Sequence, residues 1–244
     1  MPAKSRLNVF PRGYLLLFDR REAPSYSPTT GVALLFAFCF LEYLIGPRAS
    51  ILHWFGVSQP PTWVRIMVLS AIAMLATVLA RAKLSDVGLI PFSRWRAAET
   101  IYVGQVVLVA AAIFMFINLA TPRAQPAAAM QLVAISAATE IIWGFYQELI
   151  YRGLLQTELA RRFGAIAGIV VANVLFVFGP LHFYEFSGSS TPLSKAIFFS
   201  ATFAIGLIFG YIALRTRNVI FVGILHGVGD AVANVPQILH GAHS

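Results

Sequence analysis

The chain has 244 residues, of which 58% are hydrophobic and only 11% are charged. A soluble domain is about a quarter charged, so this composition excludes an ordinary soluble protein and favours a membrane protein. The net charge of +8 does not indicate nucleic-acid binding, because the basic residues stand in short clusters between apolar runs. The single cysteine, Cys39, excludes an internal disulfide and zinc sites with two or more thiolates, and we expect it to be a small buried residue.

Seven apolar runs are long enough, or nearly so, to cross a bilayer core that needs about 20 helical residues. They lie near residues 30–46, 63–81, 98–120, 128–156, 165–185, 195–214 and 218–237. The first run is short and contains Glu42, which we expect at the membrane interface. The predicted fold class is therefore all-α, a polytopic transmembrane helix bundle of about 7 spans, or about 8 with an additional re-entrant or interfacial helix.

The basic residues between these runs predict the orientation of the chain. The N-terminal arm and alternate loops carry Lys4, Arg6, Arg12, Arg20, Arg21, Arg81, Lys83, Arg94, Arg96, Arg161, Arg162, Arg215 and Arg217. The opposite loops carry only Arg48, Arg65, Arg123 and Lys195. By the positive-inside rule we expect a multi-pass protein of the cell inner membrane, with its N-terminus in the cytoplasm and its C-terminus outside.

Ionisable and polar residues within the apolar runs are concentrated in the second half of the chain. The fourth run contains Glu140, Gln147, Glu148 and Arg152, the fifth contains His182, and the seventh contains His226, Asp230 and Asn234. A charged group near the middle of a bilayer costs about 2.5–3.5 kcal/mol on insertion scales, so each such residue needs a functional or structural reason.

Helical spacing places several of these residues on shared faces. Glu148 and Arg152 are four positions apart, with the acid before the base, and His226 and Asp230 have the same spacing. If the helices bring these faces together, a carboxylate, imidazoles and a guanidinium surround one cavity. Such a set is sufficient for general-base activation of water and for stabilisation of an oxyanion.

The same residues carry a resemblance to the CPBP family of intramembrane proteases, which includes the CAAX proteases and the Abi proteins. Gln147–Gly153 resembles the family's Glu-Glu-x-x-x-Arg motif, Phe178–His182 its Phe-x-x-x-His motif, and His226–Asp230 its His-x-x-x-Asn/Asp motif. The three motifs follow the family's order on three separate runs. The resemblance implies a protease core at 98–237, preceded by an N-terminal arm and two spans at 1–97 and followed by a short tail at 238–244.

The resemblance also implies a role for each residue. Glu148 and His182 would hold and activate water, and Arg152 would orient the Glu148 carboxylate. His226 and Asp230 would stabilise the tetrahedral oxyanion. Because an ionised carboxylate cannot donate a hydrogen bond, Asp230 would do so by orienting His226 or by being protonated. For the site to assemble, Gly179–Pro180 must break the fifth run and bring His182 towards Glu148.

The chain departs from the family at Gln147, where the motif has its first glutamate. A glutamine amide can position water but cannot accept its proton. Three interpretations follow. In the first, Glu148 takes over as the base. In the second, the protein belongs to a subfamily that uses Gln at this position, or carries a substitution that silences its activity. In the third, the chain is a non-catalytic relative.

We therefore predict an intramembrane endopeptidase that cleaves the C-terminal or juxtamembrane segment of a membrane-embedded or lipid-anchored peptide. No cofactor is required by the sequence; a divalent metal such as zinc is an alternative, with Glu148, His182 and His226 as ligands. The expected partners are this substrate and the lipid bilayer, not nucleic acid. The alternatives are a catalytically silent scaffold or immunity protein and a proton-coupled transporter.

Overall fold

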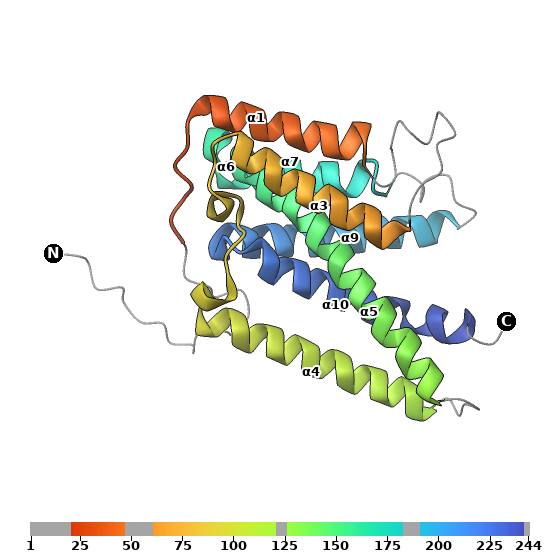
Figure 1. Cartoon of the computed structure of the whole chain (residues 1–244). Coiled ribbons are helices and arrows are strands. Elements are labelled where there is room, and N and C mark those ends of the chain that lie inside the picture. The colour runs from red at the N-terminus through yellow and green to blue at the C-terminus, as the bar shows by residue number, and fades with distance from the viewer. Residues whose placement is uncertain (1–20, 47–60, 121–125, 183–190, 242–244) are drawn as a thin grey trace, which may run out of the picture.

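The structure is a computed structural model that describes residues 21–46, 61–120, 126–182 and 191–241. All regular secondary structure in these ranges is helical, as the sequence predicts. Figure 1 shows the helices running roughly side by side along the length of the bundle, with successive long helices running in opposite directions.

The first helices show clear start signals. Helix α1, Pro28–Cys39, begins after Ser27, whose hydroxyl accepts a hydrogen bond from the Thr30 backbone N–H, and Pro28 occupies the first turn. It continues into a π-helical turn, η1, Phe40–Leu44. Helix α3 spans Thr62–Leu79 and is followed by two short 3-10 segments.

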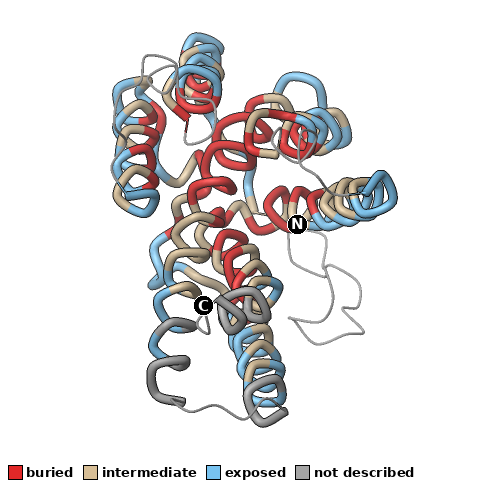
Figure 2. The backbone as a smooth tube through the Cα atoms, turned by 90° about the vertical axis from the view of Figure 1, so that its right-hand side faces the viewer, coloured by how far each residue is buried: buried red, intermediate tan, exposed pale blue. Residues whose placement is uncertain are grey.

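These segments, η2 at Leu84–Val87 and η3 at Phe92–Arg94, lead into α4, Ala97–Ala120. Most described residues of α4 are exposed, and the helix lies along one edge of the bundle (Figures 1 and 2). Its neighbours are the first turns of α10, Val219–Gly241.

The central helical path is longer than the predicted fourth run. Helix α5, Pro126–Glu148, passes into the π-helical segment η4, Leu149–Gln156, and then into α6, Thr157–Phe163. Gly164 ends this path with φ at 88°, a left-handed conformation that glycine adopts without a steric penalty. Helix α7 then spans Ala165–Phe178 and ends well before residue 185, the predicted boundary.

Helix α9, Pro192–Thr216, begins like α1, with Thr191 as its cap and Pro192 in its first turn. Arg217 adopts φ of 50° and turns the chain into α10. Figure 1 shows that the ends of α3, α6 and α9 and the beginnings of α1, α4, α7 and α10 gather at one end of the bundle.

Contacts between basic segments confirm that they share this end. The Arg21 backbone N–H donates to the Arg215 carbonyl at 2.9 Å, and the Arg21 guanidinium donates to the Arg94 carbonyl at 3.2 Å. Arg162 donates to the Pro28 carbonyl at the start of α1. The loops that the positive-inside rule groups together are therefore neighbours in space.

Much of the outer surface is apolar. The large exposed side chains include Phe36, Leu108, Phe116, Ile166 and Leu193, which lie on four different helices. Three helices, α3, α4 and α9, are long and apolar enough to cross a membrane, and α1, α7 and α10 are shorter apolar helices. The chain is a helical membrane protein. Cys39 also lies on this outer surface and is exposed, so the prediction that it is buried was wrong.

The interior is unusual because its largest buried side chains are polar. The three largest fully buried side chains are those of Arg152, Tyr146 and Tyr151. They come from the end of α5 and from η4, which lie in the red centre of Figure 2. The buried polar residues of the fourth run therefore occupy the centre of the bundle, as the sequence predicts.

Candidate active site

Close packing of α5 against α10 forms the base of the site. A Cβ atom on Gly144 would lie 2.7 Å from the Gly227 backbone nitrogen, and one on Gly223 would lie 2.7 Å from the Phe145 Cα. No side chain larger than hydrogen fits at these positions, so the two backbones approach closely. The polar side chains one turn further along each helix can then touch.

The Glu148 carboxyl lies at this contact and is 1% exposed. One of its oxygens is 2.9 Å from His226 Nδ1, and the other is 3.3 Å from Arg152 Nε. The first and third motifs thus meet across two helices, and the Glu148–Arg152 pair has the one-turn spacing that the sequence predicts. A carboxylate held by an imidazole and a guanidinium has a fixed orientation.

Arg152 is held on its other sides by α7 and α9. Its terminal nitrogen donates to the Gly206 carbonyl at 3.1 Å, and its guanidinium carbon lies 5.1 Å from the centre of the Phe176 ring. Gln156, one turn further along, donates to the Gly210 carbonyl at 2.8 Å. Asn173 on α7 donates to the same helix, α9, and all three anchors are buried.

Two of these anchors to α9, Gln156 and Asn173, were not predicted from the sequence. The signal was present: each is a polar residue in an apolar run, and Gln156 continues the Glu148–Arg152 spacing by one more turn. The Gly223–Gly227 spacing, which is typical of close helix contacts, was a second missed signal.

His226 also faces Asp230. Its Nε2 is 3.4 Å from an Asp230 oxygen, so the imidazole lies between two carboxyls, Glu148 on one side and Asp230 on the other. The side chain of His226 is 11% exposed and that of Asp230 is 37% exposed. Asp230 therefore lies at the open side of the site, with its carboxylate facing the imidazole Nε2.

His182 follows the break that Gly179–Pro180 was expected to introduce. The helix ends at Phe178, and the His182 backbone N–H donates to the Gly179 carbonyl in a tight turn. His182 Nδ1 lies 2.8 Å from the Phe176 carbonyl oxygen. A carbonyl only accepts, so Nδ1 carries the proton and the lone pair of the neutral ring is on Nε2.

Phe176 lies between the two histidines. Its ring centre is 4.9 Å from that of His182 and 5.9 Å from that of His226. The second motif therefore reaches the site through an aromatic contact, and the three motifs converge on one region of the bundle.

Gln147 is 3% exposed, and its carbonyl oxygen has no hydrogen-bond partner among the described residues. A buried polar atom of this kind is costly unless water or a ligand reaches it. Glu140 lies elsewhere on α5 and accepts a hydrogen bond from Asn234 at 2.9 Å, so its carboxyl has a partner of its own.

No three His, Cys, Asp or Glu side chains are grouped as metal ligands in the described parts of the chain. A divalent metal held by Glu148, His182 and His226 stays a prediction, and no step below uses one.

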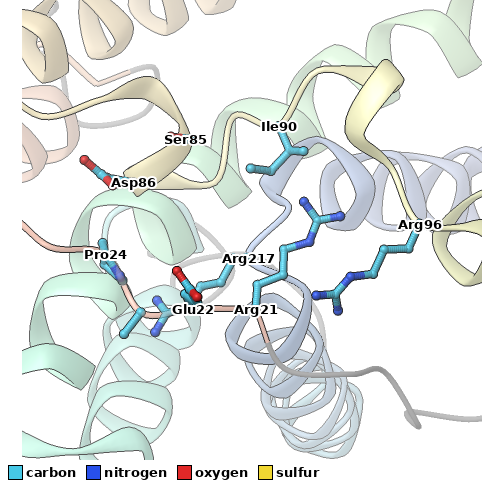
Figure 3. Close-up of a pocket in the computed structure, with 9 residues that line it drawn as sticks. Arg21, Glu22, Pro24, Ser85, Asp86, Ile90, Arg96 and Arg217 are labelled. Carbon is cyan, nitrogen blue, oxygen red and sulfur yellow. The ribbon is translucent and has the colours of Figure 1, made fainter. Parts of the chain in front are cut away.

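A concavity lies at the basic end of the bundle, away from these residues (Figure 3). It has a volume of about 520 Å³ and is lined by Arg21, Glu22, Ala23, Pro24, Ser85, Asp86, Ile90, Arg96 and Arg217. None of the motif residues lines it. Burial lowers the pKa of Arg21, an effect that the adjacent Glu99 opposes with a contact of 2.7 Å. Its charges are mixed, and it is separate from the candidate active site.

Residues 128–232 match the family model described as type II CAAX prenyl endopeptidase Rce1-like. The matched segment contains all three motifs, and the match confirms the resemblance to the CAAX proteases. Helices α1, α3 and α4 precede it. No curated protein and no solved structure matches the chain.

Proposed function

From the match of residues 128–232 to the Rce1-like CAAX endopeptidase family model, we propose that the chain is an intramembrane endopeptidase with Glu148 as its base. The observation that supports this most directly is the 2.9 Å contact between Glu148 and His226. It unites a carboxylate and an imidazole inside a largely apolar bundle, which is the pairing that acid–base chemistry on water requires.

In the proposed reaction a water molecule binds between Glu148 and His182 Nε2. Glu148 takes a proton from the water, whose oxygen forms a bond to the carbonyl carbon of the peptide as the carbonyl π electrons move to oxygen. The tetrahedral intermediate then collapses, the C–N bond breaks, and the leaving nitrogen takes the proton from Glu148. Glu148 therefore serves first as base and then as acid.

His226 is the proposed donor to the oxyanion. Since Nδ1 faces Glu148, His226 donates to the oxyanion through Nε2, which must carry a proton; the Asp230 carboxylate 3.4 Å away favours that protonation state by its charge and leaves the N–H to the oxyanion. Asp230 then acts by orienting the imidazole, since an ionised carboxylate cannot itself donate. Arg152 keeps the Glu148 carboxylate oriented through the 3.3 Å contact.

The proposed substrate is a membrane-embedded or lipid-anchored peptide, cleaved in its C-terminal or juxtamembrane segment. A site at the centre of an apolar bundle is accessible to a chain that already lies in the membrane. We further propose seven spans in the cell inner membrane, with the N-terminus in the cytoplasm and the C-terminus outside, because the clustered basic residues fit the positive-inside rule.

The test is cleavage of prenylated and unprenylated CAAX-type peptides by the purified full chain in lipid vesicles. We expect Glu148→Ala and His182→Ala each to lower kcat by about 10²–10⁴-fold, the usual contribution of a general acid–base residue. Glu140→Ala is the matched control, because it removes a carboxyl of the same helix that is bonded to Asn234 instead. Equal activity in all four proteins, or no activity in the wild type on any such peptide, contradicts the proposal.

A catalytically silent relative, acting as a scaffold or immunity protein, is the second candidate function. Gln147 favours it, because an amide replaces the motif's first carboxylate at a position that is 3% exposed. This candidate predicts no cleavage by the wild type together with cleavage by Gln147→Glu.

A further inference from the structure

Glu42 differs from the other buried carboxyl groups. Four carboxyl side chains are buried in the described part of the chain: Glu42, Glu99, Glu148 and Glu158. The last three each contact an arginine. No cation lies within ion-pair distance of Glu42 among the described residues, although its side chain is only 1% exposed. It is enclosed by protein rather than placed at the membrane interface as expected, and a buried carboxyl without a cation requires another explanation.

The groups around Glu42 are hydrogen-bond donors from two other parts of the chain. The Tyr151 hydroxyl in η4 lies 2.8 Å from a Glu42 oxygen. The backbone N–H of Leu181 also points towards this carboxyl, but no hydrogen bond of normal geometry reaches the second Glu42 oxygen, Oε2, among the described residues. A π-helical turn, η1, places Glu42 at this position at the end of α1, and such turns are frequent at functional sites.

The Tyr151 hydroxyl and the Leu181 N–H both lie at the turn that ends with His182. Leu181 is the preceding residue, 2% exposed and packed in the same core cluster as Leu41 of η1. The Tyr151 hydroxyl lies 3.3 Å from the position that a Cβ on Gly179 would occupy, at the first residue of the turn. Glu42 thus contacts the turn directly at one end, and through Tyr151 at the other.

The aromatic neighbours extend this contact to the active site. The Tyr151 ring is 5.2 Å from Phe38 of α1 and 5.2 Å from Phe176. Phe176 contacts the His182 ring and accepts its Nδ1–H through the backbone carbonyl. Movement of the Glu42 contacts would therefore move the residues that orient His182.

We propose that Glu42 is a positioning residue that fixes the Gly179–His182 turn and so holds the His182 imidazole in place. The role in catalysis rests on the proposed peptidase function; the role in fixing the turn does not. Glu42 lies outside the matched segment 128–232, so the N-terminal helix contributes an element of the active site that the family match does not include.

The chemistry of the contact explains why a carboxyl is needed. Tyrosine O–H and backbone N–H are both donors, and a side chain with acceptor oxygens can satisfy the two at once. A leucine of similar volume would leave the Tyr151 hydroxyl buried without its acceptor and would remove the carboxyl beside the Leu181 N–H, which costs more than a lost hydrogen bond between exposed groups. A glutamine retains one acceptor oxygen with two lone pairs.

The experiment compares Glu42→Leu, Glu42→Gln and the matched control Thr77→Val in lipid nanodiscs. Thr77 is also buried in the N-terminal region, but its hydroxyl donates only to the Ala73 carbonyl of its own helix. The first readout, amide hydrogen exchange in peptides that contain Leu181, needs no activity. We expect Glu42→Leu to speed this exchange by about three- to tenfold and the other two variants to leave it within about twofold of wild type.

The second readout separates kcat from KM in peptide cleavage. We expect Glu42→Leu to lower kcat by about ten- to a hundredfold with KM unchanged, because the histidine is misplaced while the substrate contacts remain. Glu42→Gln should restore most of kcat. In a double-mutant cycle Tyr151→Phe and Glu42→Leu should be non-additive, because they remove the two sides of one contact.

Each outcome has one interpretation. Unchanged exchange in Glu42→Leu overturns the proposal whatever the activity. Faster exchange with unchanged kcat in an active enzyme overturns the role of Glu42 in catalysis. Faster exchange in Glu42→Leu, together with a wild type that cleaves no peptide, supports the fixing of the turn and refutes the proposed peptidase function instead.

Discussion

The Glu148 carboxyl contacts His226 Nδ1 at 2.9 Å, although the two residues are 78 positions apart in the chain. The contact exists because Gly144, Gly223 and Gly227 allow α5 and α10 to approach closely. Arg152 fixes the same carboxyl from within its own helical path. The close approach of the glycines and the Glu148–His226 contact proposed for catalysis are therefore one structural feature, and changes to either should affect both.

The glycine contact can be tested directly with Gly227→Ala. A Cβ at this position would meet the backbone of Ile141 on α5, so the helices must separate. We expect a loss of about 1–3 kcal/mol in the free energy of unfolding, typical of overpacking, together with a large fall in kcat. Thermal unfolding in detergent and peptide cleavage measure the two effects.

Gly229→Ala is the control on the same helix. No atom lies within 4 Å of a Cβ at this position, and alanine is the better helix former by about 0.5–1 kcal/mol. Its stability should equal or exceed that of the wild type, with normal kcat. A Gly227→Ala protein as stable and active as Gly229→Ala would refute the importance of the close approach.

The role of Asp230 can be separated from that of His226. Asp230→Asn retains an oxygen that accepts a hydrogen bond from the imidazole, so we expect kcat to fall by less than about tenfold. Asp230→Leu removes the acceptor and should lower kcat by about a hundredfold or more, the size of a lost oxyanion donor. Kinetics with one peptide substrate would show the difference. Equal losses in the two variants argue that Asp230 acts through its charge alone.

Gln147→Glu tests whether the chain is silenced. If Glu148 is the base, a second carboxyl beside it is not needed, and kcat should change by less than about tenfold. The new carboxyl would be buried without a cation among its described contacts, so the melting temperature should fall. The measurements are peptide cleavage and thermal unfolding in the same detergent. A gain of about a hundredfold or more would instead identify Gln147 as a silencing residue.

The sequence predicted the parts of the site that depend on local spacing. The Glu148–Arg152 contact follows from two residues one turn apart, and the break after Phe178 follows from Gly179–Pro180. The helices follow from apolar runs of membrane length. In each case the physical cause lies within a few residues of its effect.

Contacts between distant segments could not be predicted in the same way. A single glutamate near the end of an apolar run, such as Glu42, has the same pattern at a membrane interface and in a protein core. Its partners Tyr151 and Leu181 are more than a hundred residues away, and they are chosen by how α1 packs against η4. Helix packing in an apolar environment depends on side-chain shape along each face, which the order of residues alone does not specify.

The ion pairs of Glu158 with two arginines of its own helix, α6, should make stability dependent on pH. Burial raises the pKa of Glu158, but hydrogen bonds from Arg161 and Arg162 outweigh this effect and hold it below the ordinary value of 4.5. A carboxyl with a lowered pKa in the folded state stabilises the fold at pH above its unfolded pKa, and this contribution is lost as pH falls through the folded value.

Glu158→Gln should therefore lower the free energy of unfolding by about 1 kcal/mol at pH 7, a modest value because both arginines are partly exposed. The difference from wild type should shrink as the pH falls below about 4.5, since the wild-type carboxyl then becomes protonated and loses its ion pairs. Thermal unfolding in detergent between pH 7 and pH 3 measures both proteins. A gap that stays constant across this range would show that the arginines bind Glu158 by hydrogen bonding alone, without a contribution from its charge.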